Sequence, residues 1–182
     1  MYQQNKISQS IFMTTVMIFF AVISYAQSGD LPDPKKSPGD VLAVTKSDVC
    51  TPGYAGKVRN VPESEKKKVF AAYGILTHKP KEYEVDHLIS LELGGSNSIK
   101  NLWPQSYLTS PWNAHVKDGL EDHLHSLVCK GELDLAEAQR EIATDWIAAY
   151  KKGFSTALPL PAHSAPPAKP KKRSLWDMIF GR

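Results

Sequence analysis

The sequence predicts one small α+β domain that is mostly helical. Apolar residues recur at helical spacing in two stretches after residue 111, and one short run ending at residue 87 has β character. Two cysteines are available as a brace. A chain of 182 residues can bury one modest hydrophobic core. We expect this core to lie between residues 45 and 153.

The N-terminus has the pattern of an export signal. Lys6 precedes an apolar run over residues 11–23, and the small residues of Ser24-Tyr25-Ala26 follow it. The run is short for a membrane span but typical of a signal peptide. We therefore expect residues 1–26 to be removed, leaving a periplasmic or secreted chain that begins at Gln27 and has no membrane span. An uncleaved N-terminal anchor is the alternative.

Both ends of the mature chain are predicted to lie outside the core. Residues 27–44 are rich in proline, glycine and charge, which indicates a flexible linker. Residues 154–182 form a Pro-rich basic tail, which over residues 157–173 shows no apolar periodicity. The folded unit is therefore expected at 45–153.

Three helices and one strand are predicted inside this unit. The first helix covers residues 62–73, opens on proline and stops before Gly74. A strand follows at Tyr83–His87, and a turn at Gly94–Asn97 contains glycines that permit positive φ. The later helices cover residues 111–129, ending at Gly131, and 134–153, with Asp134 spaced to cap the helix near Glu137.

Cys50 and Cys129 are predicted to form a disulfide. An exported chain enters an oxidising environment, where an even number of cysteines usually pairs into disulfides. A disulfide that closes the loop between these two cysteines would stabilise the fold by about 4 kcal/mol in the chain-entropy description, less any strain. A zinc site and a cysteine nucleophile are the less favoured alternatives.

Basic residues concentrate in one segment, although the net charge of the whole chain is only +3. Residues 57–81 contain seven lysine or arginine residues but only two acidic residues, Glu63 and Glu65. This local charge fits a polyanionic partner such as nucleic acid, or simply a solvated helix face. Lys66 and Lys67 in this segment, and Lys117 further along, are the candidates for contacting a substrate.

The adjacent residues Asp86 and His87 are the strongest candidates for chemistry. A carboxylate can hold a hard divalent cation, and a neutral imidazole can take a proton at neutral pH. Asn101 can hold the following loop by bonding to backbone groups. Together they suit phosphodiester hydrolysis without a covalent intermediate. Taken singly, Asp86 is also explained as a turn cap and His87 as a core histidine.

The stretch VDHLISLELGGSNSIKNLWPQ resembles the HNH nucleases, whose core is a ββα-metal finger. It is similar, more narrowly, to exported bacterial HNH-like proteins. Further matching pieces, over residues 49–150, are VCTPGY, VR, YG, KDGLE, VCKG and AQREIATDW. The paired Cys-x-x-Cys zinc knuckles of many HNH domains are absent from the sequence, so the disulfide is expected to brace the finger instead.

The resemblance implies a role for each site residue. Asp86 corresponds to a metal ligand, His87 to the general base and Asn101 to the asparagine of the family name. A further ligand is expected from the next helix, where His115 is favoured over Asn113. The implied cofactor is a divalent cation, Mg²⁺ before Mn²⁺ or Zn²⁺.

The predicted function is that of an exported, metal-dependent endonuclease acting on DNA or RNA. No base-reading motif is evident in the sequence, so little sequence specificity is expected. The alternative is a catalytically silent HNH-like module that binds outside the cell or at the envelope. The sequence does not distinguish DNA from RNA or indicate an oligomeric state.

Overall fold

The computed structural model describes residues 31–161. The predicted signal peptide and the part of the predicted tail beyond residue 161 lie outside this range. The elements are α1 (Lys46–Val49), α2 (Tyr54–Val58), α3 (Glu63–Ala72), β1 (Tyr83–His87), the 3₁₀ turns η1 (Leu91–Leu93) and η2 (Ile99–Asn101), β2 (Leu102–Ser106), α4 (Ala114–Lys130) and α5 (Leu135–Phe154). The fold is mixed α/β with far more helix than strand, which agrees with the coarse prediction.

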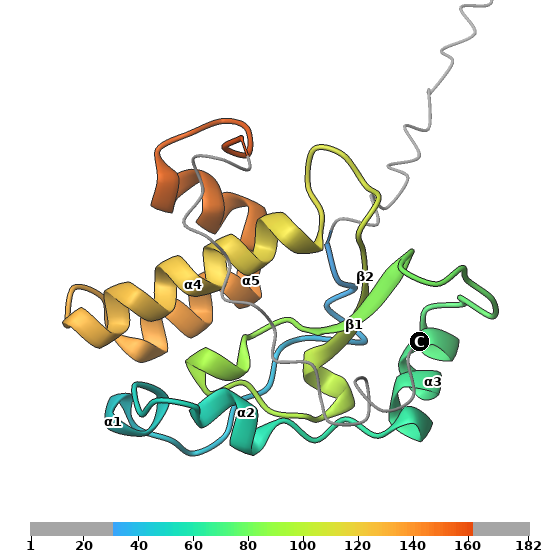
Figure 1. Ribbon diagram of the computed structural model, residues 1–182, viewed down its shortest axis with the longest axis horizontal. Helices are drawn as coiled ribbons and strands as arrows, with labels where there is room; N and C mark the ends of the chain where they lie inside the picture. The colour runs from blue at the N-terminus through green and yellow to red at the C-terminus, as the bar shows by residue number, and fades with distance from the viewer. Residues whose placement is uncertain (1–30, 162–182) are drawn as a thin grey trace, which may run out of the picture.

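Strands β1 and β2 form an antiparallel ribbon that lies beside α4 (Figure 1). Asp86 pairs with Trp103 and His87 with Leu102. The residues expected as a strand agree with β1, but β2 was not predicted from the residues. It contains Pro104, which lacks a backbone donor and is unusual inside a sheet. In a two-stranded ribbon both strands are edges, so the proline is tolerated.

Helices α4 and α5 pack side by side and provide most of the core (Figure 1). The cap at Asp134 was predicted correctly, because its side chain accepts from the backbone of Glu137. Helix α4 begins at Ala114 and not at the expected residue 111, and the Asn113 side chain caps it by accepting from the backbone of Val116. Gly131, at φ +81°, ends α4 in the left-handed conformation that glycine adopts readily. The expected stop of α5 at residue 153 is wrong by one residue. The core side chains of the two helices are Leu120, Leu124, Val128, Ala138, Ile142, Trp146, Ala149 and Tyr150.

The disulfide between Cys50 and Cys129 is present, as predicted. It joins the segment after α1 to the last turn of α4, across 79 positions of sequence. Closing a loop of this length removes entropy from the unfolded chain, which stabilises the fold by about 4 kcal/mol. The brace holds the N-terminal helices against the helix that follows the ribbon.

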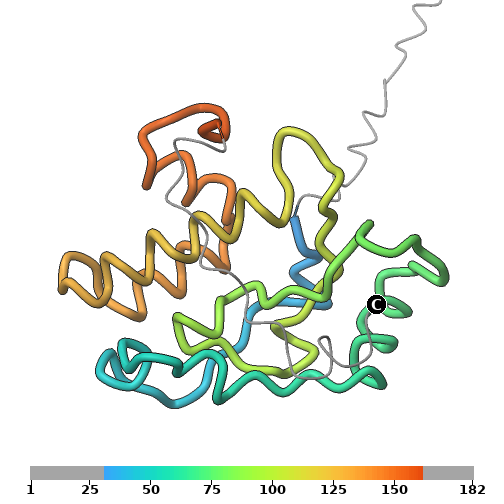
Figure 2. The backbone as a smooth tube through the Cα atoms, viewed as in Figure 1, coloured from blue at the N-terminus to red at the C-terminus, as the bar shows by residue number. Residues whose placement is uncertain are grey.

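Residues 37–42, assigned above to a flexible linker, belong to the folded unit. They run beside the loop that connects β1 to β2 (Figure 2). The Ser37 hydroxyl donates to the carbonyl of Leu102 over 2.6 Å. The backbone of Leu42 donates to the carbonyl of Gly94 over 2.8 Å. These hydrogen bonds place the start of the ordered domain before residue 45. Within residues 31–161, no helix has the length and apolarity needed to cross a membrane.

Candidate functional site

Asp86 and His87 end strand β1 and face opposite sides of the ribbon. Successive side chains of a strand alternate between its two faces. Asp86 contacts α4, whereas His87 contacts Asn97 in the loop between the strands. Both are buried, with 7% of Asp86 and 3% of His87 exposed. The pair therefore separates into two environments.

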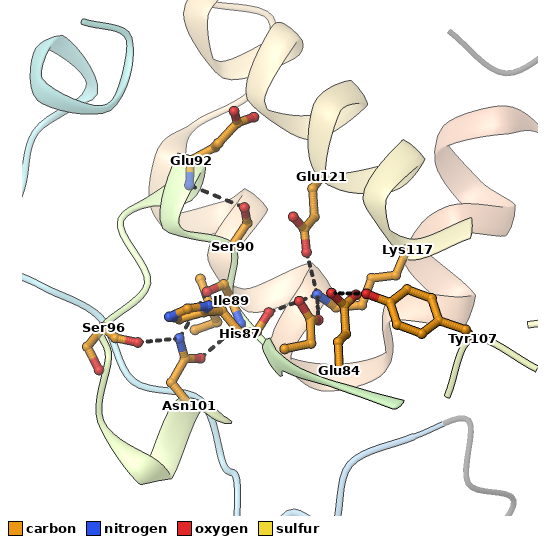
Figure 3. A network of polar contacts seen from close by, with 11 residues as sticks. Glu84, His87, Ile89, Ser90, Glu92, Ser96, Asn101, Tyr107, Lys117 and Glu121 are labelled. Atoms are coloured by element: carbon orange, nitrogen blue, oxygen red, sulfur yellow. Dashed lines mark hydrogen bonds and ion pairs between the residues drawn. The ribbon is translucent and has the colours of Figure 1, made fainter. Parts of the chain in front are cut away.

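Asp86 forms an ion pair with a fully buried lysine. The ammonium nitrogen of Lys117 lies 2.7 Å from Asp86 Oδ2, 2.8 Å from the His87 carbonyl oxygen and 2.5 Å from Glu121 Oε1. Figure 3 shows Lys117 and Glu121 reaching from α4 toward the end of β1. Burial opposes the charge on Lys117, but Asp86 and Glu121 outweigh it and raise the pKa of Lys117 above its ordinary value. The lysine stays charged.

The His87 ring is held by an amide on the other face. Its Nε2 lies 3.1 Å from Oδ1 of Asn97. The Asn97 amide nitrogen donates to the carbonyl of Val58 over 2.7 Å, and its oxygen also accepts from the backbone of Asn60. The oxygen of Asn97 therefore faces the ring, and Nε2 must carry the proton. In the neutral imidazole, Nδ1 keeps the lone pair.

Burial lowers the pKa of His87 to about 4, against the opposing effects of Asp86 and Asn97. The imidazole is therefore neutral at neutral pH. The charge of Arg59 also lowers this pKa, so Arg59 acts on His87 electrostatically. Arg59 is exposed and lies between Val58 and Asn60, the two residues whose backbones bind Asn97. An exposed guanidinium therefore acts electrostatically on a neutral imidazole.

Asn101 holds the loop between the strands, which is the role expected from the sequence. Its side chain is fully buried. The oxygen accepts from the backbone of Ile89, and the nitrogen donates to the carbonyls of Ile89 and Ser96, each over 2.9 Å (Figure 3). Asn101 touches backbone groups, so it is a positioning residue.

The two glycines of the loop serve different purposes. Gly94 has φ +78°, as the predicted turn requires. Gly95 does not have positive φ; instead, a Cβ there would lie 1.8 Å from the carbonyl oxygen of Ile89. Only glycine allows the chain to pass this close to the backbone that Asn101 clamps.

The predicted metal ligands on α4 have other partners. Asn113 caps the helix through its oxygen and donates to the carbonyl of Thr109 through its nitrogen. His115 is exposed, and its ring lies 5.1 Å from the ring of Tyr107. Asp86 already accepts from the ammonium of Lys117. A divalent cation at that oxygen would stand beside a positive charge, so this donor set does not fit the expected metal.

The three lysines expected to contact a substrate lie in different surroundings. Lys66 and Lys67 lie on α3, where Lys66 forms a pair with Glu63 over 2.6 Å and Lys67 is exposed. Lys117 is fully buried with three oxygen partners, and so does not present its charge at the surface. The expectation of direct substrate contact by Lys117 is therefore corrected.

A Cys-His cluster lies at the disulfide. Ligand atoms of Cys50, His125 and Cys129 lie within 4.8 Å of one another. The two sulfurs are bonded to each other, so neither is a thiolate that could hold a metal. His125 contacts the carbonyl of Val49 over 3.0 Å. In the disulfide form this cluster serves the brace.

Residue patterns alone missed three members of the site: Asn97, Arg59 and Glu121. The spacing of Lys117 and Glu121, four residues apart in KDGLE, does place them on one helix face. The contacts of Asn97 with residues 58–60 carry no local signal.

Comparisons with protein-family models, with curated proteins and with solved structures find no match to this chain.

Proposed function

We propose that this protein is an exported endonuclease of the HNH type that hydrolyses phosphodiester bonds of DNA or RNA with His87 as general base. The contact between His87 Nε2 and Asn97 Oδ1 carries the proposal. It fixes both the orientation and the tautomer of the ring, and leaves the lone pair on Nδ1. A core histidine needs a hydrogen-bond partner, but it does not need a neighbouring exposed arginine.

The proposed step is direct attack by water on phosphorus. Nδ1 of His87 takes a proton from the water as its oxygen attacks, while the bond between phosphorus and one sugar oxygen breaks and that departing oxygen takes a proton from solvent. The Arg59 guanidinium binds phosphate oxygens and stabilises the negative charge that develops on them. The other nitrogen of His87 stays bonded to Asn97, so the protonated ring is held in place. The basic residues of α3 add a general attraction for a polyanion.

The test is cleavage of plasmid DNA, single-stranded DNA and RNA by the purified protein. His87→Ala is expected to reduce the rate by about 10²- to 10⁴-fold, which is the usual contribution of a general base. The matched control is His78→Ala, because His78 is exposed and lies in a loop. Equal rates for the wild type and His87→Ala would reject His87 as the base.

A catalytically silent HNH-like binding module is the second candidate. Two observations favour it: only 3% of His87 is exposed, and Lys117 fills the place where a metal was expected. This candidate predicts binding of nucleic acid without cleavage. Fluorescence anisotropy with labelled oligonucleotides, measured beside the cleavage assay, separates the two functions.

A further inference from the structure

Three oxygen atoms converge on one point between β1 and α4. They are Oδ2 of Asp86, the carbonyl oxygen of His87 and Oε1 of Glu121, at distances of 2.7, 2.8 and 2.5 Å from the Lys117 ammonium. Two carboxylates and a carbonyl are the hard donors that Mg²⁺, Mn²⁺ and Ca²⁺ bind in proteins. The arrangement has the donor chemistry of a cation site, and the positive charge at its centre is the ammonium of Lys117.

The ammonium satisfies this site completely. A protonated lysine has three N–H donors, and each of the three oxygens accepts one of them. Lys117 is 0% exposed, and lysine is almost never fully buried unless it is paired. A second cation at the same oxygens would face a positive charge at contact distance in a poorly solvated place, which is strongly unfavourable.

We infer that Lys117 is the resident cation of the site, and that its ammonium takes the place of a divalent metal between Asp86, Glu121 and the backbone of His87. Asp86 is then an ion-pair partner and not a metal ligand. The bond to the His87 carbonyl makes Lys117 a positioning residue for the proposed base. This inference concerns the site itself, whereas its consequence for catalysis, cleavage without added metal, rests on the proposed function.

The first experiment compares binding of Mn²⁺ to the wild type and to Lys117→Ala by calorimetric titration. The wild type is expected to show no binding that depends on Asp86. Loss of the ammonium leaves the three oxygens facing a small space, so Lys117→Ala is expected to bind one Mn²⁺, about tenfold or more tighter than the wild type. The control variant, Asp86→Asn/Lys117→Ala/Glu121→Gln, keeps the space but lacks both carboxylates, and should not bind.

Thermal unfolding gives a second readout on the same proteins. Lys117→Ala is expected to melt about 10 °C below the wild type, because two buried carboxyl groups lose their partner. Millimolar Mn²⁺ or Ca²⁺ should recover much of this loss in Lys117→Ala, and should change neither the wild type nor the triple variant. Absence of both binding and recovery in a folded Lys117→Ala would overturn the inference.

The wild-type titration decides the question if Lys117→Ala does not fold with any cation. One Mn²⁺ bound per wild-type molecule, and lost in Asp86→Asn, shows that Lys117 is not the resident cation; no such binding supports the inference. Cleavage by the wild type in EDTA supports it further, and cleavage only with added Mg²⁺ opposes it. A wild type that cleaves under no condition rejects the proposed nuclease but leaves the metal titration decisive.

Discussion

Asp86 and His87 are adjacent in sequence but serve in two different environments. On the Asp86 face, the Asp86 carboxylate and the Glu121 carboxyl group both bind the Lys117 ammonium inside the protein, and burial raises the pKa of Glu121 to about 8. On the His87 face, one amide holds a neutral ring, and an exposed arginine lies close enough to lower its pKa. The first arrangement leaves no charge available to a ligand at the surface, whereas the second has an exposed guanidinium and a lone pair on a buried ring. We conclude that Asp86 supports the strand end and that the proposed chemistry belongs to His87.

The largest expected effect on stability tests this contrast directly. Asp86→Ala leaves Lys117 buried with one carboxylate fewer, which should lower the free energy of unfolding by about 3–5 kcal/mol. His87→Ala removes one hydrogen bond and a ring, and should cost less. Urea denaturation followed by circular dichroism measures both. A larger loss for His87→Ala than for Asp86→Ala would reverse the contrast.

The next effect is a pH dependence of stability that belongs to His87. Burial lowers its pKa from 6.5 to about 4 on folding. Between these values the unfolded chain binds more protons at this position than the folded protein does, so unfolding becomes easier as the pH falls. The contribution is complete above pH 6.5 and decreases by about 3 kcal/mol on acidification to pH 4.

Denaturation of the wild type and His87→Gln at several pH values isolates this contribution. As the pH falls from 6.5 to 4, the unfolding free energy of the wild type should decrease relative to that of His87→Gln, because only the wild type carries the imidazole. A constant difference across this range contradicts a buried neutral His87.

Asn97→Ala tests how far the chemistry depends on the fixed ring. Without the Asn97 oxygen, Nε2 loses the contact that selects its tautomer, and the rate of cleavage should fall by about tenfold to a hundredfold. Substrate affinity should change little. The control is Asn60→Ala, because Asn60 binds Asn97 through its backbone only. Kinetic analysis should show the loss in kcat and not in KM.

The smallest effect is expected from Arg59. Arg59→Lys keeps the charge but loses the planar fork that binds two phosphate oxygens at once, so kcat/KM should fall by about tenfold or less. Arg59→Ala should lose more, and the affinity for an oligonucleotide should become less sensitive to salt. Lys68→Ala, on exposed α3, is the control for a general loss of basic charge. Equal effects of Arg59→Ala and Lys68→Ala would remove Arg59 from the site.

Local sequence signals predicted much of the fold but only part of the site. The bounds of β1, the cap at Asp134 and the disulfide follow from propensity, capping chemistry and cysteine count. Strand β2 was missed because Pro104 and polar residues obscure its alternation.

The role of Lys117 was missed for a different reason. Its partner Asp86 lies 31 residues away, and only the packing of α4 against the ribbon brings their charges together. Similarly, Asn97 was not predicted to hold the His87 ring, because its other contacts come from a segment 37 to 39 residues away. Contacts that depend on tertiary packing leave no periodic pattern in the sequence.

The initial rate of plasmid nicking in EDTA, measured for the wild type beside His87→Ala and His78→Ala, tests the central claim most directly. If His87 is the base and Lys117 occupies the expected metal site, the wild type and His78→Ala nick the plasmid at equal rates without metal. His87→Ala is then slower by about 10²-fold or more. Nicking by the wild type that stops in EDTA and returns with Mg²⁺, or equal nicking by His87→Ala, would contradict the account.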